Sequence, residues 1–283
     1  MSAGSRLAGV IGWPARQSLS PRLHGYWLRE YGIDGSYVSL AIPEIDFSRA
    51  LLGIRLAGFA GANITIPHKQ AAFAIAHESD AVARAAGAAN LLVFRNDRIE
   101  ARNTDVAGLE ASLVEELGLD GLDGKSVVIL GAGGAARAAV LACDRLKSRK
   151  ISVLNRTGQR ANGLVHNLSG FVAASIHSHG FEDWARIAPE TTLVVHATSA
   201  GMDGSASLDL DLTFLPANAF ICDLVYRPLE TALLWRARQL GLRGIDGLGM
   251  LMHQAVPSFE AFYGLRPQVT SALRIELEKA LLR

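Results

Sequence analysis

Residues 127–136 read Val-Val-Ile-Leu-Gly-Ala-Gly-Gly-Ala-Ala, an apolar run that ends in closely spaced glycines. The apolar run predicts a buried strand, and the alanine-rich segment after it predicts a helix. Gly131 permits a tight turn, Gly133 lets the backbone approach a pyrophosphate, and the small Ala136 lets the helix pack close to the strand. Unpaired N–H groups at the start of the helix would face the phosphates. The stretch therefore predicts a dinucleotide site, with a plain structural turn as the alternative.

The segment after the next apolar run indicates which dinucleotide binds. Residues 151–154 predict the second strand, and Asn-Arg-Thr-Gly-Gln-Arg follows at residues 155–160. An NAD site normally places Asp or Glu here, where the carboxylate accepts a hydrogen bond from the ribose 2′-hydroxyl. This chain instead has Arg156 and Arg160, and two guanidinium groups facing a 2′-phosphate would favour NADP by about 10–100-fold. The alternative is that Thr157 caps the next helix and both arginines are solvated.

Strands and helices alternate outward from this stretch. The predicted strands are residues 7–11, 37–41, 61–66, 91–94, 98–101, 127–130, 151–154, 192–196 and 219–224. The predicted helices are residues 21–31, 47–56, 69–76, 80–86, 105–117, 135–146, 159–168, 229–240, 248–263 and 268–282. Because strands that alternate with helices form parallel βαβ units, the pattern predicts an α/β fold, with one hairpin at residues 91–101. The turn-rich segment at residues 118–124 is the best candidate for a boundary between domains.

Composition bounds the class of protein. A chain of 283 residues corresponds to about two domains, and 49% hydrophobic with 19% charged residues excludes a disordered protein. The formal net charge of +1 gives no basic footprint for nucleic acid. Two cysteines cannot form a disulfide framework, and His177 and His179 lack a third metal ligand, so we expect no metal site and a surface loop there. Without a signal pattern or a long apolar run, we expect a soluble cytoplasmic protein with no membrane partner.

Polar residues that could hold a small molecule cluster where predicted strands end or helices begin. The motifs that contain them are residues 12–21, with Ser18 and Ser20; 63–69, with Asn63, Thr65 and Lys69; 87–90, with Asn90; 103–105, with Asp105; 223–230, with Tyr226; and 247–254, with Gln254. Taken together and in this order, the motifs and the glycine turn resemble those of the shikimate dehydrogenase family over nearly the whole chain.

The resemblance implies a fold and a reaction. It implies an N-terminal α/β substrate domain (residues 1–106), a Rossmann-type parallel-sheet NADP domain (107–247), and C-terminal helices (248–283) that return to the first domain. The implied reaction is the reversible NADPH-dependent reduction of 3-dehydroshikimate to shikimate, in the pathway to chorismate and the aromatic amino acids. We expect a small-molecule substrate and a monomer or homodimer.

The resemblance also implies roles for individual residues. Lys69 and Asp105 would form the catalytic pair. Ser18, Ser20 and Tyr226 would hold the substrate carboxylate, and Asn63, Thr65, Asn90 and Gln254 its other polar groups. The contacts with NADP would come from Gly131, Ala132, Gly133, Gly134, Ala135, Asn155, Arg156, Thr157, Arg160, Thr198, Val225, Gly247 and Met250.

The chemistry of alcohol oxidation supports the Lys–Asp assignment independently. Removing a hydride from an alcohol carbon requires a proton to leave the oxygen, and a Lys–Asp pair can relay that proton or hold the hydroxyl in line. Lys suits this task better than Arg, because Arg does not deprotonate in a protein. The alternatives for single residues are that Ser20 and Asp105 only cap helices and that Lys69 is a solvated residue.

The chain departs from the family pattern at four positions. Gln17 stands where the family usually has His, and His196 begins the segment that is usually Asn-Ala-Thr. Leu91 and Val106 replace the usual Thr and Gly directly after two predicted site residues, so the shape of the pocket could differ. For His196 the alternatives are a packed, hydrogen-bonded histidine and a catalytic proton carrier.

Two other functions fit the sequence less well. A quinate/shikimate dehydrogenase would accept quinate, which has one more hydroxyl beside its carboxylate, and would use NAD or NADP. A non-catalytic NADP-binding regulator would have no need for both Lys69 and Asp105. Folate and glutamyl-tRNA enzymes with similar Rossmann halves lack the combination of these two residues with Ser18 and Ser20.

Overall fold

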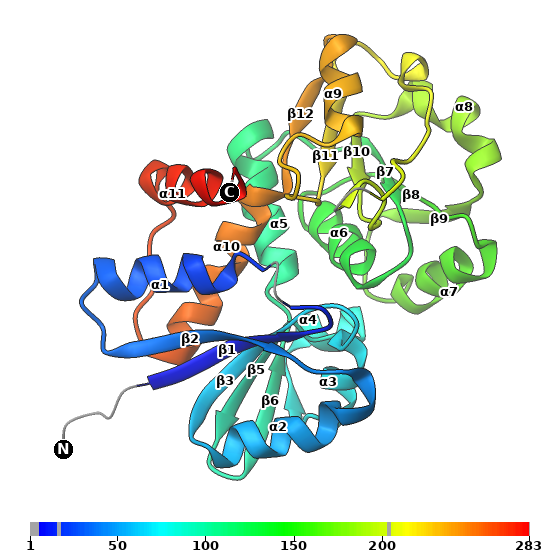
Figure 1. Ribbon diagram of the computed structural model, residues 1–283. Helices are drawn as coiled ribbons and strands as arrows, with labels where there is room; N and C mark the ends of the chain where they lie inside the picture. Colours follow the sequence, from blue (N-terminus) through cyan, green and yellow to red (C-terminus); the bar gives the residue numbers. More distant parts are fainter. Residues whose placement is uncertain (1–5, 16–17, 203–204, 283) are drawn as a thin grey trace. The chain divides into compact units, whose positions relative to one another are not determined.

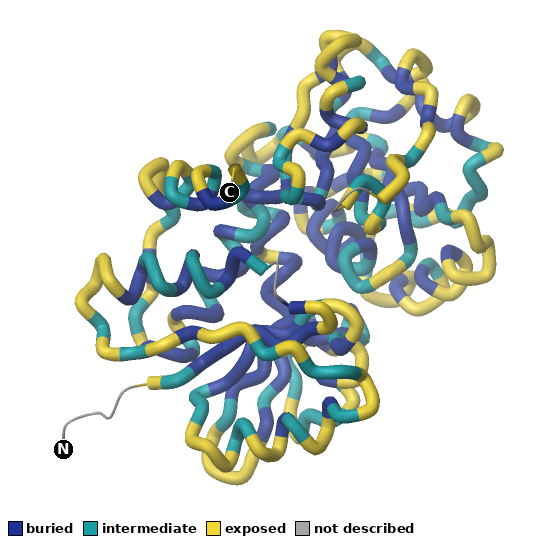
Figure 2. Tube along the Cα trace, viewed as in Figure 1, coloured by how far each residue is buried: buried dark blue, intermediate teal, exposed yellow. Residues whose placement is uncertain are grey.

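The computed structural model describes residues 6–15, 18–202 and 205–282 (Figure 1). The chain forms two compact units. Unit 1 comprises Met1–Asp105 and Leu251–Arg283, and unit 2 comprises Val106–Met250. In each unit the inner strands of a sheet are buried, the edge strands are more exposed, and the outer faces of the helices are exposed (Figure 2).

Unit 1 is built on a mixed six-stranded sheet of order β2-β1-β3-β5-β6-β4. Its elements are β1 (Arg6–Gly12), α1 (Ser20–Glu30), β2 (Gly35–Ala41), η1 (Glu44–Asp46), α2 (Phe47–Leu56), β3 (Phe59–Ile64), α3 (Lys69–Ile75), β4 (Glu78–Ser79), α4 (Ala81–Ala86), β5 (Leu91–Arg95) and β6 (Arg98–Arg102), with α11 (Ser271–Leu281) and the second part of α10 (Gly247–Tyr263). Strands β2, β1 and β3 run parallel, and β5 and β6 form the predicted antiparallel hairpin.

The alternation of side chains along β3 separates the two faces of this sheet. Ala62 and Ile64 join the apolar cluster that α2 and α3 cover, together with Phe47 and Leu51. Successive strand residues point to opposite faces, so Asn63 points the other way. On that face its amide meets α10, where Nδ2 donates to Ser258 Oγ at 2.8 Å. The polar Asn63 therefore distinguishes the face of the sheet toward α10 from the apolar face that α2 and α3 cover.

Unit 2 is a parallel six-stranded sheet of order β12-β11-β10-β7-β8-β9. Its elements are α5 (Asp105–Leu117), β7 (Ser126–Leu130), α6 (Gly134–Arg145), β8 (Lys150–Leu154), α7 (Gly158–Leu168), β9 (Ser175–His179), η2 (Phe181–Asp183), α8 (Trp184–Ile187), η3 (Ala188–Glu190), β10 (Leu193–His196), η5 (Leu212–Phe214), β11 (Phe220–Asp223), α9 (Ala232–Gln239), β12 (Arg243–Ile245) and the start of α10. Strand β7 is the first strand of this sheet in the sequence and lies at its centre. Strands β8 and β9 follow on one side of it, and β10, β11 and β12 on the other, so the topological switch point lies between β7 and β10.

The predicted α/β class, with one all-parallel Rossmann-like sheet, is confirmed. The prediction of a surface loop at His177 and His179 is wrong, because both residues lie in edge strand β9, which pairs with β8. The prediction of Ser20 as a helix cap is also wrong, because Ser20 is already helical and the Leu19 position before it has no side-chain cap. In the part of the chain that the structure describes, no helix is long and apolar enough to cross a membrane.

Candidate active site

The turn after β3 places Lys69 at the first residue of α3. The backbone N–H of Thr65 donates to Ile11 O at 2.9 Å, and the N–H of His68 donates to Thr65 O at 2.9 Å. The buried His68 ring stacks on Phe47 with ring centroids 4.6 Å apart, and its Nε2 lies 2.7 Å from Ile42 O. These contacts fix the turn, so the direction of the Lys69 side chain is set by the fold.

Lys69 forms an ion pair with Asp105, the first residue of α5. Nζ lies 2.5 Å from Oδ2, and the two side chains are only 19% and 7% exposed. The N–H of Asp105 donates to Asn103 Oδ1 at 3.1 Å, and Asp105 Oδ1 accepts from Asn90 Nδ2 at 2.8 Å. The carboxylate is therefore held on both sides, and it presents one oxygen to the lysine. Lys69 is therefore paired and largely buried, so the alternative of a solvated lysine does not hold.

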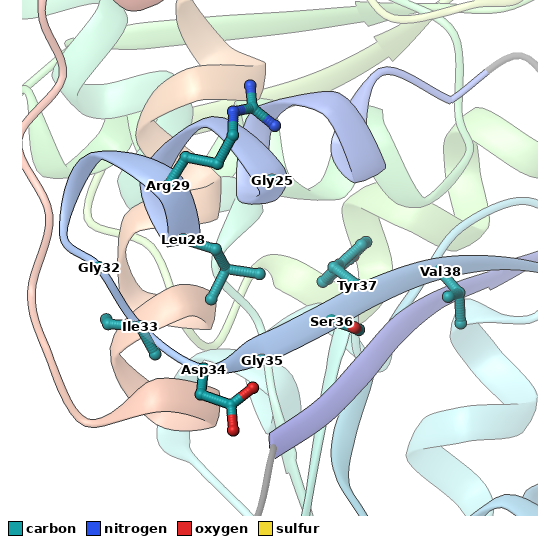
Figure 3. Close-up of a pocket in the computed structure, with 10 residues that line it drawn as sticks. All are labelled: Gly25, Leu28, Arg29, Gly32, Ile33, Asp34, Gly35, Ser36, Tyr37 and Val38. Carbon is teal, nitrogen blue, oxygen red and sulfur yellow. The ribbon is translucent and has the colours of Figure 1, made fainter.

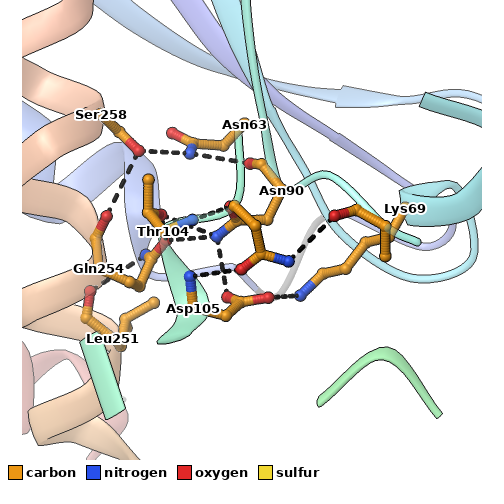
Figure 4. A network of polar contacts seen from close by, with 10 residues as sticks. Asn63, Lys69, Asn90, Thr104, Asp105, Leu251, Gln254 and Ser258 are labelled. Atoms are coloured by element: carbon orange, nitrogen blue, oxygen red, sulfur yellow. Dashed lines mark hydrogen bonds and ion pairs between the residues drawn. The ribbon is translucent and has the colours of Figure 1, made fainter. Parts of the chain in front are cut away.

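Asn90 is the centre of the network around this pair (Figure 4). Its Oδ1 accepts from the N–H of Thr104 at 2.7 Å, and its Nδ2 also lies 2.9 Å from Thr104 Oγ1 and 3.2 Å from Gln254 Oε1. Gln254 in turn donates from Nε2 to Leu251 O at 3.1 Å. The network joins the start of β5, α5 and α10, and all of these residues belong to unit 1 or its edge.

Asn63 extends the network toward β2. Its Nδ2 donates to Asn90 O at 3.1 Å as well as to Ser258, and its Oδ1 accepts from the Tyr37 hydroxyl at 2.8 Å. Burial raises the pKa of Tyr37 well above its usual range, with Tyr263 nearby adding to the rise and a hydrogen bond with Ser20 opposing it. Tyr37 therefore stays protonated and links the amide of Asn63 to the start of α1.

Sequence reasoning missed four members of this network: Tyr37, Asn103, Thr104 and Ser258. A helical signal for Ser258 exists, because it lies four residues after Gln254 and so shares its face of α10. Thr104 stands inside the quoted Asn103–Asp105 motif. Tyr37 carries no such signal, since an aromatic residue in a strand is ordinary core composition.

The remaining predicted substrate residues divide between the units. In unit 1, Ser18 Oγ accepts from the N–H of Ser20 at 3.2 Å, Ser20 is buried, and Thr65 is half-buried in the turn before Lys69. Tyr226 belongs to unit 2, in the loop after β11. Gln17 lies outside the described residues. Five of the predicted residues thus belong to the hydrogen-bonded network around Asn90: Lys69, Asp105, Asn63, Asn90 and Gln254.

One hollow on unit 1 does not contain this network (Figure 3). It is open, lies between the end of α1 and the edge strand β2, and is lined by Gly25, Leu28, Arg29, Gly32, Ile33, Asp34, Gly35, Ser36, Tyr37 and Val38. Tyr37 is the single residue that it shares with the network, and the Tyr37 hydroxyl is directed to Asn63. We therefore place the candidate active site at the polar network.

The glycine turn of unit 2 has the geometry that a pyrophosphate requires. Gly131 has φ +113°, and a Cβ there would lie 3.0 Å from Thr198 Cγ2. Gly133 occupies the N-cap position of α6 without a side-chain cap, and nothing lies within 4 Å of where its Cβ would stand. The N–H groups of the helix start are thus open, at Gly134 and Ala135. Beneath them Ala136 is fully buried, and Ala132 lies in the turn.

The segment after β8 offers cations to a phosphate. Arg156 and Arg160 are exposed, and within the described ranges neither has an ion-pair partner. Thr157 is the N-cap residue of α7, yet its hydroxyl makes no capping hydrogen bond, and its carbonyl accepts from Asn155 Nδ2 at 2.9 Å. The start of α7 and both guanidinium groups are therefore available to an anion. The residues fit an NADP phosphate, and no carboxylate stands in the segment.

The other predicted cofactor residues lie near the carboxyl ends of β7, β10 and β11. Thr198 packs beside Gly131, and the N–H of Val225 donates to Asp223 Oδ1 at 3.0 Å. Gly247 begins α10 so close to β11 that a Cβ would lie 2.3 Å from Leu224 O, and Met250 is half-buried one turn on. Among the described residues, no group of three or more His, Cys, Asp or Glu could hold a metal ion.

Comparison with known proteins covers both units. Residues 10–92 match the family described as "Shikimate dehydrogenase substrate binding domain", and residues 113–203 match "Shikimate / quinate 5-dehydrogenase". The "Shikimate dehydrogenase (NADP(+))" of Paramagnetospirillum magneticum is 45% identical over 97% of this chain and 98% of that protein. That of Methylobacterium radiotolerans is 46% identical over 97% of both chains.

Solved structures agree with these relatives. Shikimate 5-dehydrogenase from Thermus thermophilus, in complex with NADP(H) and shikimate, is 32% identical, with a TM-score of 0.84 over 98% of both chains. Quinate dehydrogenase from Corynebacterium glutamicum, in complex with NAD, is 30% identical, with a TM-score of 0.87 over 99% of this chain and 100% of that one. Since relatives of this similarity span nearly the whole sequence, the chain belongs to the shikimate dehydrogenase family.

Proposed function

We propose that this protein is an NADP-dependent shikimate dehydrogenase that reversibly reduces 3-dehydroshikimate to shikimate. The observation that carries the proposal is the Lys69–Asp105 ion pair set within a network of neutral amides and hydroxyls. A substrate with one carboxylate and several hydroxyls needs such groups around a single proton-handling centre. The second support is the exposed pair of Arg156 and Arg160, which form no ion pair with any described residue and match the NADP named for the relatives.

The catalytic pair handles the proton of the reacting hydroxyl. NADP, when bound, supplies or accepts the hydride. Asp105 Oδ2 engages one ammonium hydrogen of Lys69, which leaves the other two for a substrate oxygen. In the reduction of 3-dehydroshikimate, this ammonium holds the carbonyl oxygen in line and donates a proton to it; in shikimate oxidation, the neutral amine of Lys69 accepts the hydroxyl proton and becomes the ammonium again. Asn90 fixes Asp105, so it positions the pair without touching the proton.

The hydroxyl-bearing residues bind the substrate. We assign the carboxylate to Ser18, Ser20 and Tyr226, and the ring hydroxyls to Thr65 and the amides of Asn63, Asn90 and Gln254. The hydrogen bonds of Asn63 with Tyr37, Asn90 and Ser258 fix the orientation of its amide. The turn Gly131–Ala135 would hold the pyrophosphate of NADP, and Arg156 and Arg160 would hold its 2′-phosphate.

We infer further that the enzyme acts in the cytoplasm as a monomer or homodimer. Both cysteines, Cys143 and Cys222, are free and buried, which agrees with a reducing compartment. Burial raises the pKa of Cys143 to about 12, so its thiol is unreactive at neutral pH. Light scattering of the purified chain measures its mass and separates the two oligomeric states.

Replacement of Lys69 tests the proposal. Lys69→Met should lower kcat for shikimate oxidation by about 10²–10⁴-fold, while the Kd for NADPH changes less than about twofold. Lys69→Arg should also fail, because Arg keeps a positive charge and cannot release a proton. The matched control is Lys125→Met, which removes an exposed lysine from the segment before β7 and should leave kcat unchanged. Normal turnover in Lys69→Met would refute the assignment.

Initial rates with four substrate pairs test the specificity. Shikimate and quinate are each measured with NADP and with NAD, by the absorbance of the reduced cofactor. We expect the highest kcat/KM for shikimate with NADP. Preference for quinate or NAD would show a quinate/shikimate dehydrogenase instead, and no turnover with any pair would show a non-catalytic protein.

A further inference from the structure

A buried chain of hydrogen bonds crosses the carboxyl ends of β10 and β11. His196 and Asp223, the last residues of these strands, are register partners, and both are buried. His196 Nδ1 lies 2.9 Å from Asp223 Oδ1, and His196 Nε2 lies 2.6 Å from Thr198 Oγ1. A packed histidine needs no such alignment, so the chain Asp223–His196–Thr198 is a candidate for a role in function.

The direction of these hydrogen bonds follows from their other partners. Asp223 Oδ1 accepts from the N–H of Val225 at 3.0 Å, and Oδ2 accepts from the Thr231 hydroxyl at 2.6 Å. The carboxylate is thus an acceptor throughout, and His196 Nδ1 is the donor to it. In the neutral ring Nε2 is then an acceptor, so the Thr198 hydroxyl donates its one hydrogen to His196.

The hydroxyl of Thr198 is left with acceptor capacity alone. Its oxygen already accepts from the N–H of Ala200 at 3.1 Å, and one further lone pair remains. Thr198 is only partly buried, so a ligand can reach that lone pair. A group in this state binds an N–H or O–H donor and repels a phosphate oxygen, which has no hydrogen to offer.

Strand order indicates which part of the cofactor meets Thr198. The proposed contacts with the 2′-phosphate follow β8, and the pyrophosphate turn follows β7. Strand β10 lies on the other side of β7, and His196 pairs with Leu130, directly before Gly131. A dinucleotide that runs from β8 across β7 therefore reaches β10 with its nicotinamide half, at the switch point of the sheet.

We propose that Asp223 and His196 hold Thr198 as a fixed hydrogen-bond acceptor for a donor in the nicotinamide half of NADP. The donor is the carboxamide N–H or a hydroxyl of the nicotinamide ribose. His196 is a positioning residue, since it acts through Thr198 and touches no ligand in this scheme. The inference rests on the proposed use of NADP and assigns a function to one of the four departures from the family pattern.

Equilibrium binding of NADPH, followed by its fluorescence, tests the proposal. Thr198→Val removes the hydroxyl at constant volume and should raise the Kd about 3–10-fold, whereas Thr198→Ser should stay within about twofold of the wild type. His196→Asn cannot span the distance from Asp223 to Thr198 and should raise the Kd as well. Because His196 acts through Thr198, the double variant with Thr198→Val should bind no worse than Thr198→Val alone.

Ligand analogues identify the donor. If the donor is the carboxamide, Thr198→Val should weaken NADPH but leave the 3-acetylpyridine analogue, which lacks that N–H, unaffected. If it is the ribose hydroxyl, both should weaken alike. Adenosine 2′,5′-bisphosphate lacks the nicotinamide half and should bind every variant equally.

Three results would overturn the inference. The first is an unchanged Kd for NADPH in Thr198→Val. The second is a rise in Kd in the double variant that equals the product of the rises in the two single variants. The third is a rise in the Kd for adenosine 2′,5′-bisphosphate as large as the rise for NADPH. The KM for shikimate should not change in any variant. Failure of the proposed function would appear separately, as absent shikimate turnover in the wild type, while the NADPH titrations still report on Thr198.

Discussion

His24 is a buried histidine whose ring has no hydrogen-bonding partner among the described residues. It lies in α1 of unit 1, stacked on Tyr37 with ring centroids 3.9 Å apart and planes 4° from parallel. Trp27 and Phe259 complete an aromatic environment at 6.0 Å and 5.8 Å between centroids. Within the described part of the chain, both ring nitrogens are buried and unpaired. Burial lowers the pKa of His24 to about 3.

The low pKa makes the stability of unit 1 depend on pH. Below about pH 6.5 the His24 ring binds a proton in the unfolded chain. In the folded chain the same ring stays neutral down to about pH 3. The folded state then binds fewer protons than the unfolded state. The free energy of unfolding is therefore highest, as far as His24 is concerned, above pH 6.5, and it falls as the pH is lowered toward 3. At pH 5, about 1.5 pH units below the unfolded value, the loss is about 2 kcal/mol.

The substitution His24→Phe removes this titration while keeping a ring in the stack. At pH 8 two effects on the free energy of unfolding oppose each other. Removing two buried, unsatisfied nitrogens raises it by about 1–3 kcal/mol, and fitting the slightly larger phenyl ring into the core lowers it by about 1–3 kcal/mol. The change at pH 8 is therefore small. At pH 5 the wild type has lost about 2 kcal/mol that the variant keeps. The difference between the two proteins should thus grow by about 2 kcal/mol from pH 8 to pH 5.

Urea unfolding followed by tryptophan fluorescence measures the difference, because Trp27 lies beside His24. The control is His166→Phe, an exposed histidine on α7, for which the difference from the wild type should be the same at both pH values. An equal effect of His24→Phe at pH 5 and pH 8 would mean that His24 is protonated in the folded protein, contrary to its surroundings.

Three further predictions follow from the sites. Replacing Arg156 and Arg160 together by Ala should raise the Kd for NADPH about 10–100-fold and leave NADH unchanged, and equal losses would refute the contact with the 2′-phosphate. Tyr37→Phe removes the hydroxyl that donates to Asn63 and should cost about 1 kcal/mol of stability with a higher KM for shikimate, as urea unfolding and initial rates would show. Gly131→Ala requires φ near +113° and brings a Cβ to 3.0 Å from a side-chain carbon, so thermal unfolding and NADPH titration should both show losses of about 1–3 kcal/mol.

Local sequence patterns predicted most of the fold because most elements have their own signal. Helices 47–56 and 105–117 were predicted to the residue, since apolar spacing and flanking turns mark both ends. Strand β9 was missed because Ser175–His179 is a polar edge strand, held by backbone pairing to β8, and edge strands need no apolar run. Helix α9 begins at Ala232 rather than residue 229, because Thr231 caps it through Leu234 N.

The candidate site could be predicted only in part. Lys69 and Asp105 are 36 residues apart, and no local pattern brings them together; the family resemblance did. Tyr37 joins the site through the pairing of β2 with β1, which sets its position opposite Ala8, so that its hydroxyl reaches Asn63 in β3 on the far side of β1. Such a role depends on sheet register, which is a property of distant segments and leaves no mark in the sequence around the residue.

The proposed catalytic network lies in unit 1 and the proposed Thr198 contact lies in unit 2, so the two proposals can be tested separately. The described hydrogen bonds of Lys69, Asp105 and Asn90 are made within the network of unit 1, and those of His196, Asp223 and Thr198 within unit 2. Sites that share no partners have additive effects on free energy, whereas residues in one network do not. Asn90→Ala should therefore be coupled to Lys69→Met in kcat and independent of Thr198→Val. Strong coupling between Asn90 and Thr198 would mean that cofactor and substrate contacts depend on one another, and the assignment of one task to each unit would fail.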